Sequence, residues 1–281
     1  MTNIEKFRAG EIGFYEDIPF SEYAALKAVN SSTLKEMLVS PLHFKYLLDN
    51  PRKDTSSMRV GRAVHTAVLE PSEFSKQYIQ EPKFDKRTTK GKEDSAKWNK
   101  QNTGKEVIES AEYDKCLAIR ESVYRNSRAK QLLDVPAPNE ISFIWRDKGT
   151  GVLCKGRLDR YVSIDNKPTV LDLKTTSRRA TPKDFIKDIL EYKYYFSAAH
   201  YLKGLSTLTG KEHTKFIIIA AESTAPYGVA TYQLSNTWIA NGFWQVEELL
   251  KTYKECLDNG VWRGYEENIV EIDAPSYAFP T

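Results

Sequence analysis

Residues 152–176 read VLCKGRLDRYVSIDNKPTVLDLKTT, and the rest of the chain is organised around this stretch. Successive side chains of a β-strand point to opposite faces, so Asp172 and Lys174 share one face and the leucines beside them share the other. Residues 165–168, DNKP, are typical of a turn. The pattern therefore predicts a β-hairpin whose two strands bring Asp159 beside Asp172.

The first strand of this hairpin shows the same alternation. Lys155, Arg157, Asp159 and Tyr161 occupy every second position of the run. We therefore expect these four side chains to lie on one face of the strand. One face of the hairpin then packs, and the other is available for chemistry.

The two carboxylates of the hairpin suggest a cation site, because neighbouring negative charges repel each other unless a positive charge lies between them. A divalent cation is a natural candidate, since Mg²⁺ prefers oxygen ligands and commonly binds through one or two carboxylates. Lys174 would then hold or deprotonate a water beside the cation, or stabilise charge in the transition state. An ordinary salt-bridged hairpin has the same spacing, so the residues alone leave both interpretations open.

The order of Asp159 and then Asp172-Leu173-Lys174 resembles the D…(D/E)xK signature of the PD-(D/E)XK nuclease superfamily. The chain is similar to one branch of it, the RecE-type exonucleases (exonuclease VIII) and their phage relatives, and more distantly to lambda exonuclease. The DxK triplet alone is a weak signal, whereas the ordered set of motifs is specific. Further passages that carry the resemblance are SSTL at 31–34 followed by Ser40-Pro41, GRAVH at 61–65 running into LEP at 69–71, and CKGRLD at 154–159.

The resemblance implies an α/β fold with a restriction-endonuclease-like core, in which helices flank a central mixed sheet, together with N-terminal helices and a basic insertion. It implies a metal-dependent exodeoxyribonuclease that digests linear double-stranded DNA from 5′ to 3′. The product would be a 3′ single-stranded overhang for homologous recombination by single-strand annealing. Implied partners are duplex DNA ends, an annealing recombinase of the RecT type, and further copies of the chain in a trimeric or tetrameric ring. The implied setting is the cytoplasm of a bacterial host, with a phage or prophage as the source.

The resemblance also implies roles for individual residues. The implied catalytic residues are Lys174, Asp172 and Asp159. The implied ligands of Mg²⁺, with Mn²⁺ as an alternative, are His65, Asp159, Asp172, the Leu173 main-chain carbonyl and Glu140. The residues implied to lie near bound DNA are Ser31, Ser32, Arg62, Arg157, Thr175 and Tyr201.

Several of these residues have a plain structural alternative. Ser32 has the properties of an N-cap before a core helix. His65 belongs to a helix expected over 58–70, where a lone histidine is usually a hydrogen-bonded surface or core residue. In the resembling nucleases the GxxxH histidine lies at the metal, and the resemblance implies that Gly61 allows close approach there. Glu140 fits a solvated strand start, and Arg157 fits pairing with a carboxylate as well as contact with a phosphate.

One position departs from the family pattern. The helical segment after residues 181–184 carries a QxxxY motif in the resembling proteins, and here Tyr201 matches the tyrosine while Ser197 stands where glutamine is expected. Serine reaches less far and offers a single donor. This motivates a second hypothesis, a DNA-end-binding protein that keeps the fold without catalysis. An endonuclease on the same fold is a third.

Length and composition are consistent with one large domain, because 281 residues of which 41% are hydrophobic can bury a full core. We expect a single nuclease domain over 1–281, with an extended lead-in at 1–22, a basic flexible segment at 84–105 and a C-terminal tail at 262–281 on the surface or on a neighbouring subunit. The net charge of +3 fits an enzyme better than a packaging protein of bulk basic character. DNA contact must then be local, and segment 84–105 is a candidate flap along the backbone.

The three cysteines, Cys116, Cys154 and Cys256, are odd in number and lack the spacing of a disulfide framework or a zinc site. This pattern predicts a reducing, cytoplasmic setting. Apolar runs fall short of membrane length, and the N-terminus lacks the apolar core of a signal peptide, so we expect no membrane partner.

Overall fold

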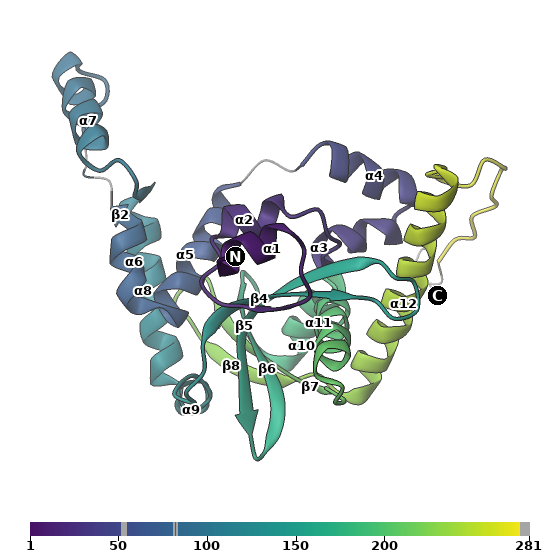
Figure 1. The fold of residues 1–281 in the computed structure, drawn as a ribbon. Helices are drawn as coiled ribbons and strands as arrows, with labels where there is room; N and C mark the ends of the chain where they lie inside the picture. The colour runs from purple at the N-terminus through teal and green to yellow at the C-terminus, as the bar shows by residue number, and fades with distance from the viewer. Residues whose placement is uncertain (52–54, 81, 83, 276–281) are drawn as a thin grey trace.

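A six-stranded mixed sheet forms the centre of the computed structural model, which describes residues 1–51, 55–80, 82 and 84–275. The strand order is β1-β4-β5-β6-β7-β8 (Figure 1). β6 and β7 are parallel, and the other neighbouring pairs are antiparallel. The strands are β1 (Gly13–Tyr15), β4 (Asn139–Arg146), β5 (Leu153–Ile164), β6 (Lys167–Thr176), β7 (Lys215–Glu222) and β8 (Val229–Gln233).

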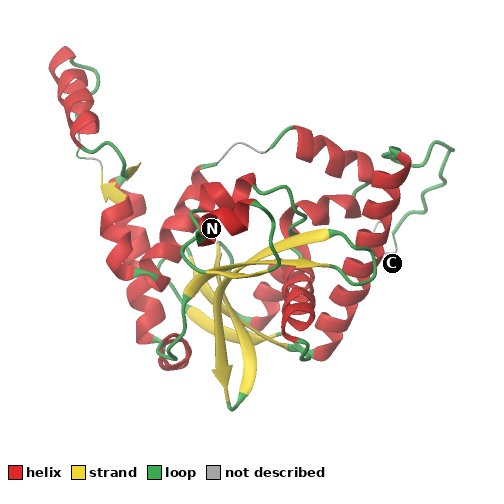
Figure 2. Cartoon of the chain, viewed as in Figure 1, coloured by secondary structure: helices red, strands yellow, loops and turns green. Residues whose placement is uncertain are grey.

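Helices pack around this sheet (Figure 2). Before the hairpin they are α1 (Asn3–Arg8), α2 (Phe20–Ala25), α3 (Ser31–Leu34), the 3₁₀ helix η1 (Lys35–Leu38), α4 (Pro41–Asp49), α5 (Ser56–Leu69), α6 (Pro71–Gln77), α7 (Thr89–Gln101), α8 (Ser110–Arg125) and α9 (Ser127–Leu133). After it they are α10 (Pro182–Glu191), α11 (Tyr194–Thr209) and α12 (Asn236–Asn259). A separate parallel pair is formed by β2 (Tyr78–Gln80) and β3 (Glu106–Ile108). The mixed sheet flanked by helices confirms the predicted α/β fold class.

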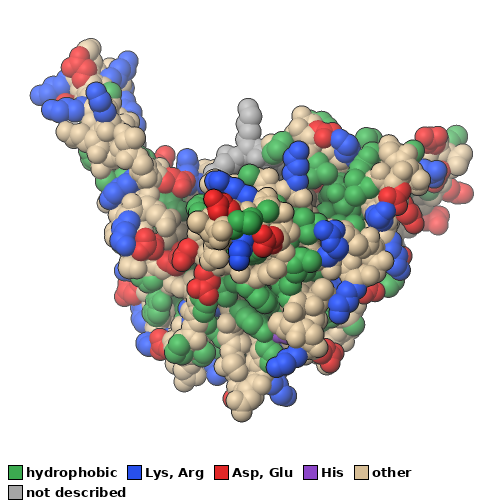
Figure 3. Space-filling model, in the orientation of Figure 1, with side chains coloured by type: hydrophobic (Ala, Val, Ile, Leu, Met, Phe, Trp, Pro, Cys, Tyr) green, Lys and Arg blue, Asp and Glu red, His purple; other side chains and the backbone are tan. Residues whose placement is uncertain are grey.

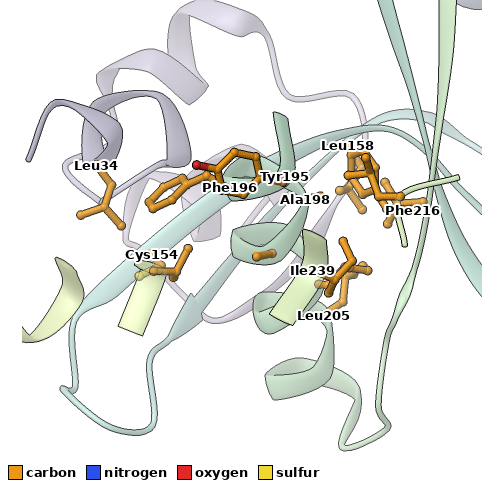
Figure 4. Close-up of a cluster of buried hydrophobic side chains, with 14 of the residues drawn as sticks. Leu34, Cys154, Leu158, Tyr195, Phe196, Ala198, Leu205, Phe216 and Ile239 are labelled. Carbon is orange, nitrogen blue, oxygen red and sulfur yellow. The ribbon is translucent and has the colours of Figure 1, made fainter. Parts of the chain in front are cut away.

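β7 shows how the sheet divides the core in two. Phe216, Ile218 and Ala220 belong to a core shared with α3, α10, α11 and α12, whereas Ile219 and Ala221 belong to a core shared with α5, α6, α8 and α9. Figure 4 shows part of the first core. A strand that is buried on both faces reads as a continuous apolar run rather than an alternating one, which is the pattern of this segment.

The predicted hairpin is formed by β5 and β6. Its turn consists of Asp165 and Asn166, which have φ angles of 49° and 58°. Both residue types tolerate this left-handed conformation, which two-residue hairpin turns require. Strand pairing then runs from Ile164 opposite Lys167 to Arg160 opposite Leu171. The turn therefore sets the register of the strands that carry the candidate site.

The expected one-face alternation along β5 holds only in part. Leu158 is buried in the first core and Tyr161 packs against the same core, although the two are three positions apart. Strict alternation would place them on opposite faces, so Tyr161 leaves the face predicted for it. In the neighbouring strand Glu140 has a φ of 52°, an uncommon conformation for a non-glycine residue. Such local irregularities of a sheet are frequent beside active sites.

The expectation of an extended lead-in over 1–22 is wrong. The segment folds into α1, β1 and the start of α2, and β1 pairs with β4. Phe7, Tyr15 and Ile18 are buried in a small core of their own. The cause lies in local chemistry, because Thr2 and Glu5 form a reciprocal capping box that starts α1. Elements this short show too few turns or alternations to reveal a period.

The basic segment over 84–105 contains a regular helix, α7, which its composition did not predict. The Thr88 side chain caps the helix by accepting the Gly91 N–H. α7 projects from the body of the molecule, and Lys and Arg side chains stand out on its surface (Figures 1 and 3). Of its residues only Gly91 and Ser95 are buried, which agrees with the predicted solvated character.

The predicted C-terminal tail begins on the surface of the molecule. The Trp262 ring stacks on Phe44 with centroids 5.8 Å apart, and the Leu42 N–H donates to the Arg263 carbonyl at 2.9 Å. These contacts attach the start of the tail to α4. The end of the predicted tail, 276–281, lies outside the described residues.

Across residues 1–51, 55–80, 82 and 84–275, we find no helix that combines the length and the apolarity needed to span a bilayer.

We predict that acidification destabilises the fold through His200, which is fully buried on α11. Burial lowers the pKa of His200 to about 4. Below its ordinary value of about 6.5 the unfolded chain gains a proton that the folded chain does not, so stability falls as pH decreases from 6.5 towards 4. Between pH 7 and pH 5 this group should cost about 2 kcal/mol.

Urea unfolding of the wild type and of His200→Gln at both pH values measures this effect. The variant should lose about 2 kcal/mol less on acidification than the wild type. An equal loss in both chains would show that His200 does not cause the pH dependence.

Candidate active site

The hairpin register places Asp159 opposite Asp172, one step beyond the last backbone pair, Arg160 with Leu171. Here the strands part, and the Leu173 N–H donates to Asp159 Oδ2 at 2.6 Å instead of to a backbone carbonyl. A side-chain carboxylate of β5 thus accepts the hydrogen bond that a backbone carbonyl of β5 would accept in a regular strand pair. The predicted proximity of the two carboxylates is present, and its cause is the register that the turn sets.

Asp172 and Lys174 share a face of β6 as predicted. Lys174 Nζ lies 2.6 Å from Asp172 Oδ2. A carboxylate offers about four lone-pair sites, so this ion pair leaves lone pairs of Asp172 that can face a cation. On its other side, Lys174 Nζ lies 5.6 Å from the centroid of the Tyr194 ring, which is a cation–π distance.

His65 reaches the same place from α5. Its Nδ1 lies 3.5 Å from Asp159 Oδ2, so the histidine is adjacent to the acids as the resemblance implied. A Cβ built at Gly61 meets nothing within 4 Å, so the role in close approach that the resemblance implies for this glycine stays a prediction. Close packing within the chain therefore does not account for this glycine.

Glu140 completes a group of potential metal ligands. Donor atoms of His65, Glu140 and Asp159 lie within 4.8 Å of one another. Carboxylate oxygens with an imidazole nitrogen suit Mg²⁺ and Mn²⁺, so this donor set fits a divalent cation. Asp172 lies outside this group of three and faces Lys174 instead. The Leu173 carbonyl remains a predicted ligand.

The electrostatics of the group depend on burial and on mutual attraction. Burial works against the charge of Asp159, but His65, Lys174 and the Leu173 N–H outweigh it and lower the pKa of Asp159 to about 2. Burial likewise opposes charge on His65, yet Asp159 raises its pKa. Burial, together with Asp159, raises the pKa of Glu140. The charges of these three groups therefore act on one another's pKa values.

The pKa of Asp172 is shifted in the opposite direction to that of Asp159. Burial, reinforced by Asp159, raises the pKa of Asp172 despite the attraction of Lys174. For Lys174 burial is unfavourable, but Asp172 and Asp159 raise its pKa above the ordinary value. Lys174 is therefore an ammonium group at neutral pH.

Arg157 pairs with a carboxylate, one of the two alternatives that the sequence left open. Its Nε donates to Glu140 Oε2 at 2.7 Å, and its Nη1 donates to the Ile18 carbonyl at 2.8 Å. Arg157 thus orients Glu140 and ties the site to the N-terminal segment. The phosphate contact that the resemblance implies for Arg157 stays a prediction.

The other residues implied near DNA lie at different depths. Ser31 is buried, where it forms a side-chain hydrogen bond with Tyr201, and Ser32 is exposed. The predicted N-cap at Ser32 is wrong, because Asn30 accepts the Thr33 N–H and caps α3. Burial raises the pKa of Tyr201 to about 12, and the charges of Asp172, Lys174 and Asp159 also act on it, so Tyr201 and Ser31 lie near the site.

Arg62 contacts other side chains of the chain, and Thr175 and Ser197 are half-buried. Arg62 pairs with Glu106 at 3.7 Å and lies 5.9 Å from the centroid of the Phe20 ring. Thr175 is half-buried on β6, and Ser197 is half-buried in the first turn of α11. The DNA roles of these residues remain predictions.

Sequence reasoning missed Lys35, a second lysine at the site. Its Nζ donates to the Tyr192 carbonyl at 2.8 Å. Burial and the positive charge of Lys174 lower the pKa of Lys35 to about 7, although Asp172 opposes the shift. The only local signal for Lys35 was its position directly after the SSTL motif. That position does not predict a contact with a residue as distant in sequence as Tyr192.

Two further groups near the site were also missed. Glu70, within the LEP motif, has a pKa raised by burial and by Glu140. Lys155 is buried rather than available for chemistry, because its Nζ donates to the carbonyls of Tyr23 at 2.6 Å and Leu26 at 2.7 Å. Lys155 therefore holds the end of α2 against β5.

A mixed sheet that carries Asp159 opposite an Asp-x-Lys triplet, beside a helix histidine, defines a domain of the PD-(D/E)XK nuclease superfamily. The comparison with protein families agrees, because residues 30–274 match the model of the PDDEXK-like domain of unknown function (DUF3799). The chain belongs to this family. Comparison with curated proteins finds no match.

Solved structures support the fold. A protein from Eubacterium rectale, provisionally named an exonuclease, aligns with a TM-score of 0.57 and 14% identity over 92% of this chain and 94% of its own. SSO0001 aligns with a TM-score of 0.28 and 19% identity over 50% of this chain and 67% of its own. Protein VC1899 from Vibrio cholerae aligns with a TM-score of 0.25 and 11% identity over 92% of this chain and 61% of its own. The last two likenesses are too low to carry an argument.

We predict that a divalent cation stabilises the folded chain through Asp159. Mg²⁺ or Mn²⁺ at a hundredfold excess over its Kd should add about 2.7 kcal/mol, because a ligand that binds only the folded state stabilises it by mass action. Asp159→Asn keeps an acceptor for the Leu173 N–H but removes the charge, so most of this stabilisation should disappear.

Thermal unfolding with and without the cation measures the shift in Tm. Asp165→Asn, at the exposed turn of the same hairpin, is the matched control and should respond to the cation like the wild type. Equal shifts in the wild type and in Asp159→Asn would contradict the assignment of Asp159 as a ligand.

Proposed function

We propose that this chain is a metal-dependent deoxyribonuclease that hydrolyses phosphodiester bonds. The main support is that Asp159, Asp172 and Lys174 lie close together on the sheet, and that His65 from α5 lies beside them. Membership of a PDDEXK-like family supports the proposal, because this arrangement of acids and lysine is the family signature. An ordinary salt-bridged hairpin does not bring a helix histidine to the acids.

The metal would be held by His65, Glu140 and Asp159, with Asp172 supplying a further oxygen. When bound, a divalent cation supplies positive charge that stabilises phosphoryl transfer. The remaining steps belong to the chain's own side chains. Asp172 fixes the Lys174 ammonium at 2.6 Å.

Lys174 acts as a donor rather than as a base in this proposal. Its raised pKa keeps it protonated at neutral pH, so it has hydrogens to offer and no lone pair to accept one. An ammonium placed beside the acids can hold the attacking water and stabilise negative charge that develops on the phosphate. Of the roles considered from sequence, this one fits the electrostatics.

The finer parts of the proposal rest on the resemblance alone. They are digestion of linear double-stranded DNA from 5′ to 3′, production of 3′ overhangs for single-strand annealing, assembly of a trimeric or tetrameric ring, a RecT-type partner and Mg²⁺ as the preferred ion. A bacterial cytoplasm with a phage or prophage source belongs to the same proposal. A fold shared by many nucleases does not decide among these properties.

The second candidate function is DNA-end binding without catalysis. Ser197 favours it, because this serine replaces the glutamine of the QxxxY motif. Against it stands the intact Asp159, Asp172 and Lys174 set. The two functions differ in whether nucleotides are released from DNA.

Release of nucleotides from a linear duplex that carries a 5′-phosphate at one end, with Mg²⁺ or with EDTA, tests the proposal. We expect cation-dependent release from the phosphorylated end and an untouched covalently closed circle. Cutting of the circle would identify an endonuclease. Binding of ends without release under any divalent cation would favour the end-binding protein.

We predict that Lys174→Ala lowers the rate of nucleotide release by about 10²–10³-fold, the usual effect of removing one donor to a developing negative charge. DNA binding should persist, because the surrounding surface is unchanged. Lys167→Ala, at the other end of β6, is the matched control and should retain the wild-type rate, since Lys167 is exposed near the hairpin turn. Equal rates for the two variants would remove Lys174 from the mechanism.

A further inference from the structure

The junction between α10 and α11 places two tyrosines beside each other. Tyr192 ends α10, Lys193 adopts a left-handed conformation with φ 51° and ψ 50°, and α11 begins at Tyr194. This reversal stacks the rings of Tyr192 and Tyr194, whose centroids lie 5.7 Å apart at an interplanar angle of 26°. A left-handed lysine is uncommon, so the turn is held by the structure around it.

The inner ring of this pair is anchored in the protein. Tyr194 packs against Phe185 with centroids 6.0 Å apart, and Phe185 stacks on Tyr232 at 5.4 Å. Tyr194 also lies 5.6 Å from Lys174 Nζ. The stack therefore runs from the first core to the edge of the candidate active site.

The outer ring is left open to solvent. Tyr192 is 49% exposed although its ring contacts Tyr194. A ring that stacks on one side and remains exposed on the other can accept a further flat partner.

Lysines lie near the junction that carries this ring. Lys35 Nζ donates to the Tyr192 carbonyl, Lys193 is the next residue, and Lys174 lies beyond Tyr194. These lysines would attract an anion that binds there.

An exposed aromatic ring among lysines is the combination with which proteins bind single-stranded nucleic acid, because bases stack on rings and phosphates attract cations. We propose that Tyr192 is the platform on which an unpaired or terminal nucleobase stacks when its strand enters the site. The proposal rests on the proposed nuclease function. A base within a duplex has both faces covered, so the platform would select the end of a strand.

This platform would position the strand rather than react with it. Stacking on Tyr192 would fix the base, and the lysines would attract the phosphates towards Lys174. Tyr192 is then a residue that determines specificity for DNA ends. A merely structural role, in which Tyr192 only covers Tyr194, predicts no dependence of DNA binding on the aromatic character of residue 192.

The test measures stacking directly, with a DNA duplex that carries 2-aminopurine at its terminal nucleotide. EDTA prevents digestion during binding. We expect the wild type and Tyr192→Phe to quench the fluorescence of the bound end, and Tyr192→Leu to leave it bright. Tyr192→Leu should also raise the Kd about 5- to 150-fold, the range for loss of one stacked base.

Digestion kinetics and a control variant complete the experiment. Tyr192→Leu should raise KM more than it lowers kcat, because a binding contact is lost. Trp244→Leu removes an exposed aromatic ring from α12 and should match the wild type. Circular dichroism verifies that each variant is folded.

The outcomes separate this proposal from the one on which it rests. If Tyr192→Leu matches the wild type in quenching, affinity and KM, the proposal of a stacking platform is wrong. The proposed nuclease function would still stand. A wild-type chain that neither binds nor digests DNA would overturn both. If Tyr192→Phe keeps the quenching and affinity that Tyr192→Leu loses, the aromatic ring of residue 192 is the cause of both.

Discussion

The contact between Asp159 Oδ2 and the Leu173 N–H, at 2.6 Å, is the interaction on which the site depends. It occurs where β5 and β6 separate, so a carboxylate takes the place of a backbone acceptor. A buried acid in this position costs free energy unless it is paired. The structure compensates with His65 from α5 and with Lys174 from β6.

The same constraint explains why residues far apart in sequence converge here. Three acids, Glu140, Asp159 and Asp172, gather in a partly buried space, and their repulsion must be balanced. Arg157 balances Glu140, and Lys174 balances Asp172. A cation bound among His65, Glu140 and Asp159 would neutralise the remaining negative charge. The proposed hydrolysis would depend on this bound cation.

Much of the fold and of this site could be predicted because the signals are local. A two-residue alternation and a turn of Asp165 and Asn166 predict the hairpin, and the register follows from the turn. The lead-in over 1–22 could not be predicted, because three-residue strands and six-residue helices have no readable period. The alternation also failed at Tyr161, which packs against the same core as Leu158 although the two are three positions apart.

The sequence by itself determined that Asp159 and an Asp-x-Lys triplet would meet on a hairpin, because alternation and turn chemistry act between near neighbours. Tertiary structure alone decided that His65 reaches Asp159, that Arg157 pairs with Glu140, and that Asp172 lies outside the group formed by His65, Glu140 and Asp159. It also decided the contact of Lys35 with Tyr192, which lie 157 positions apart. Such contacts depend on how whole helices pack on the sheet, and no local pattern encodes that packing.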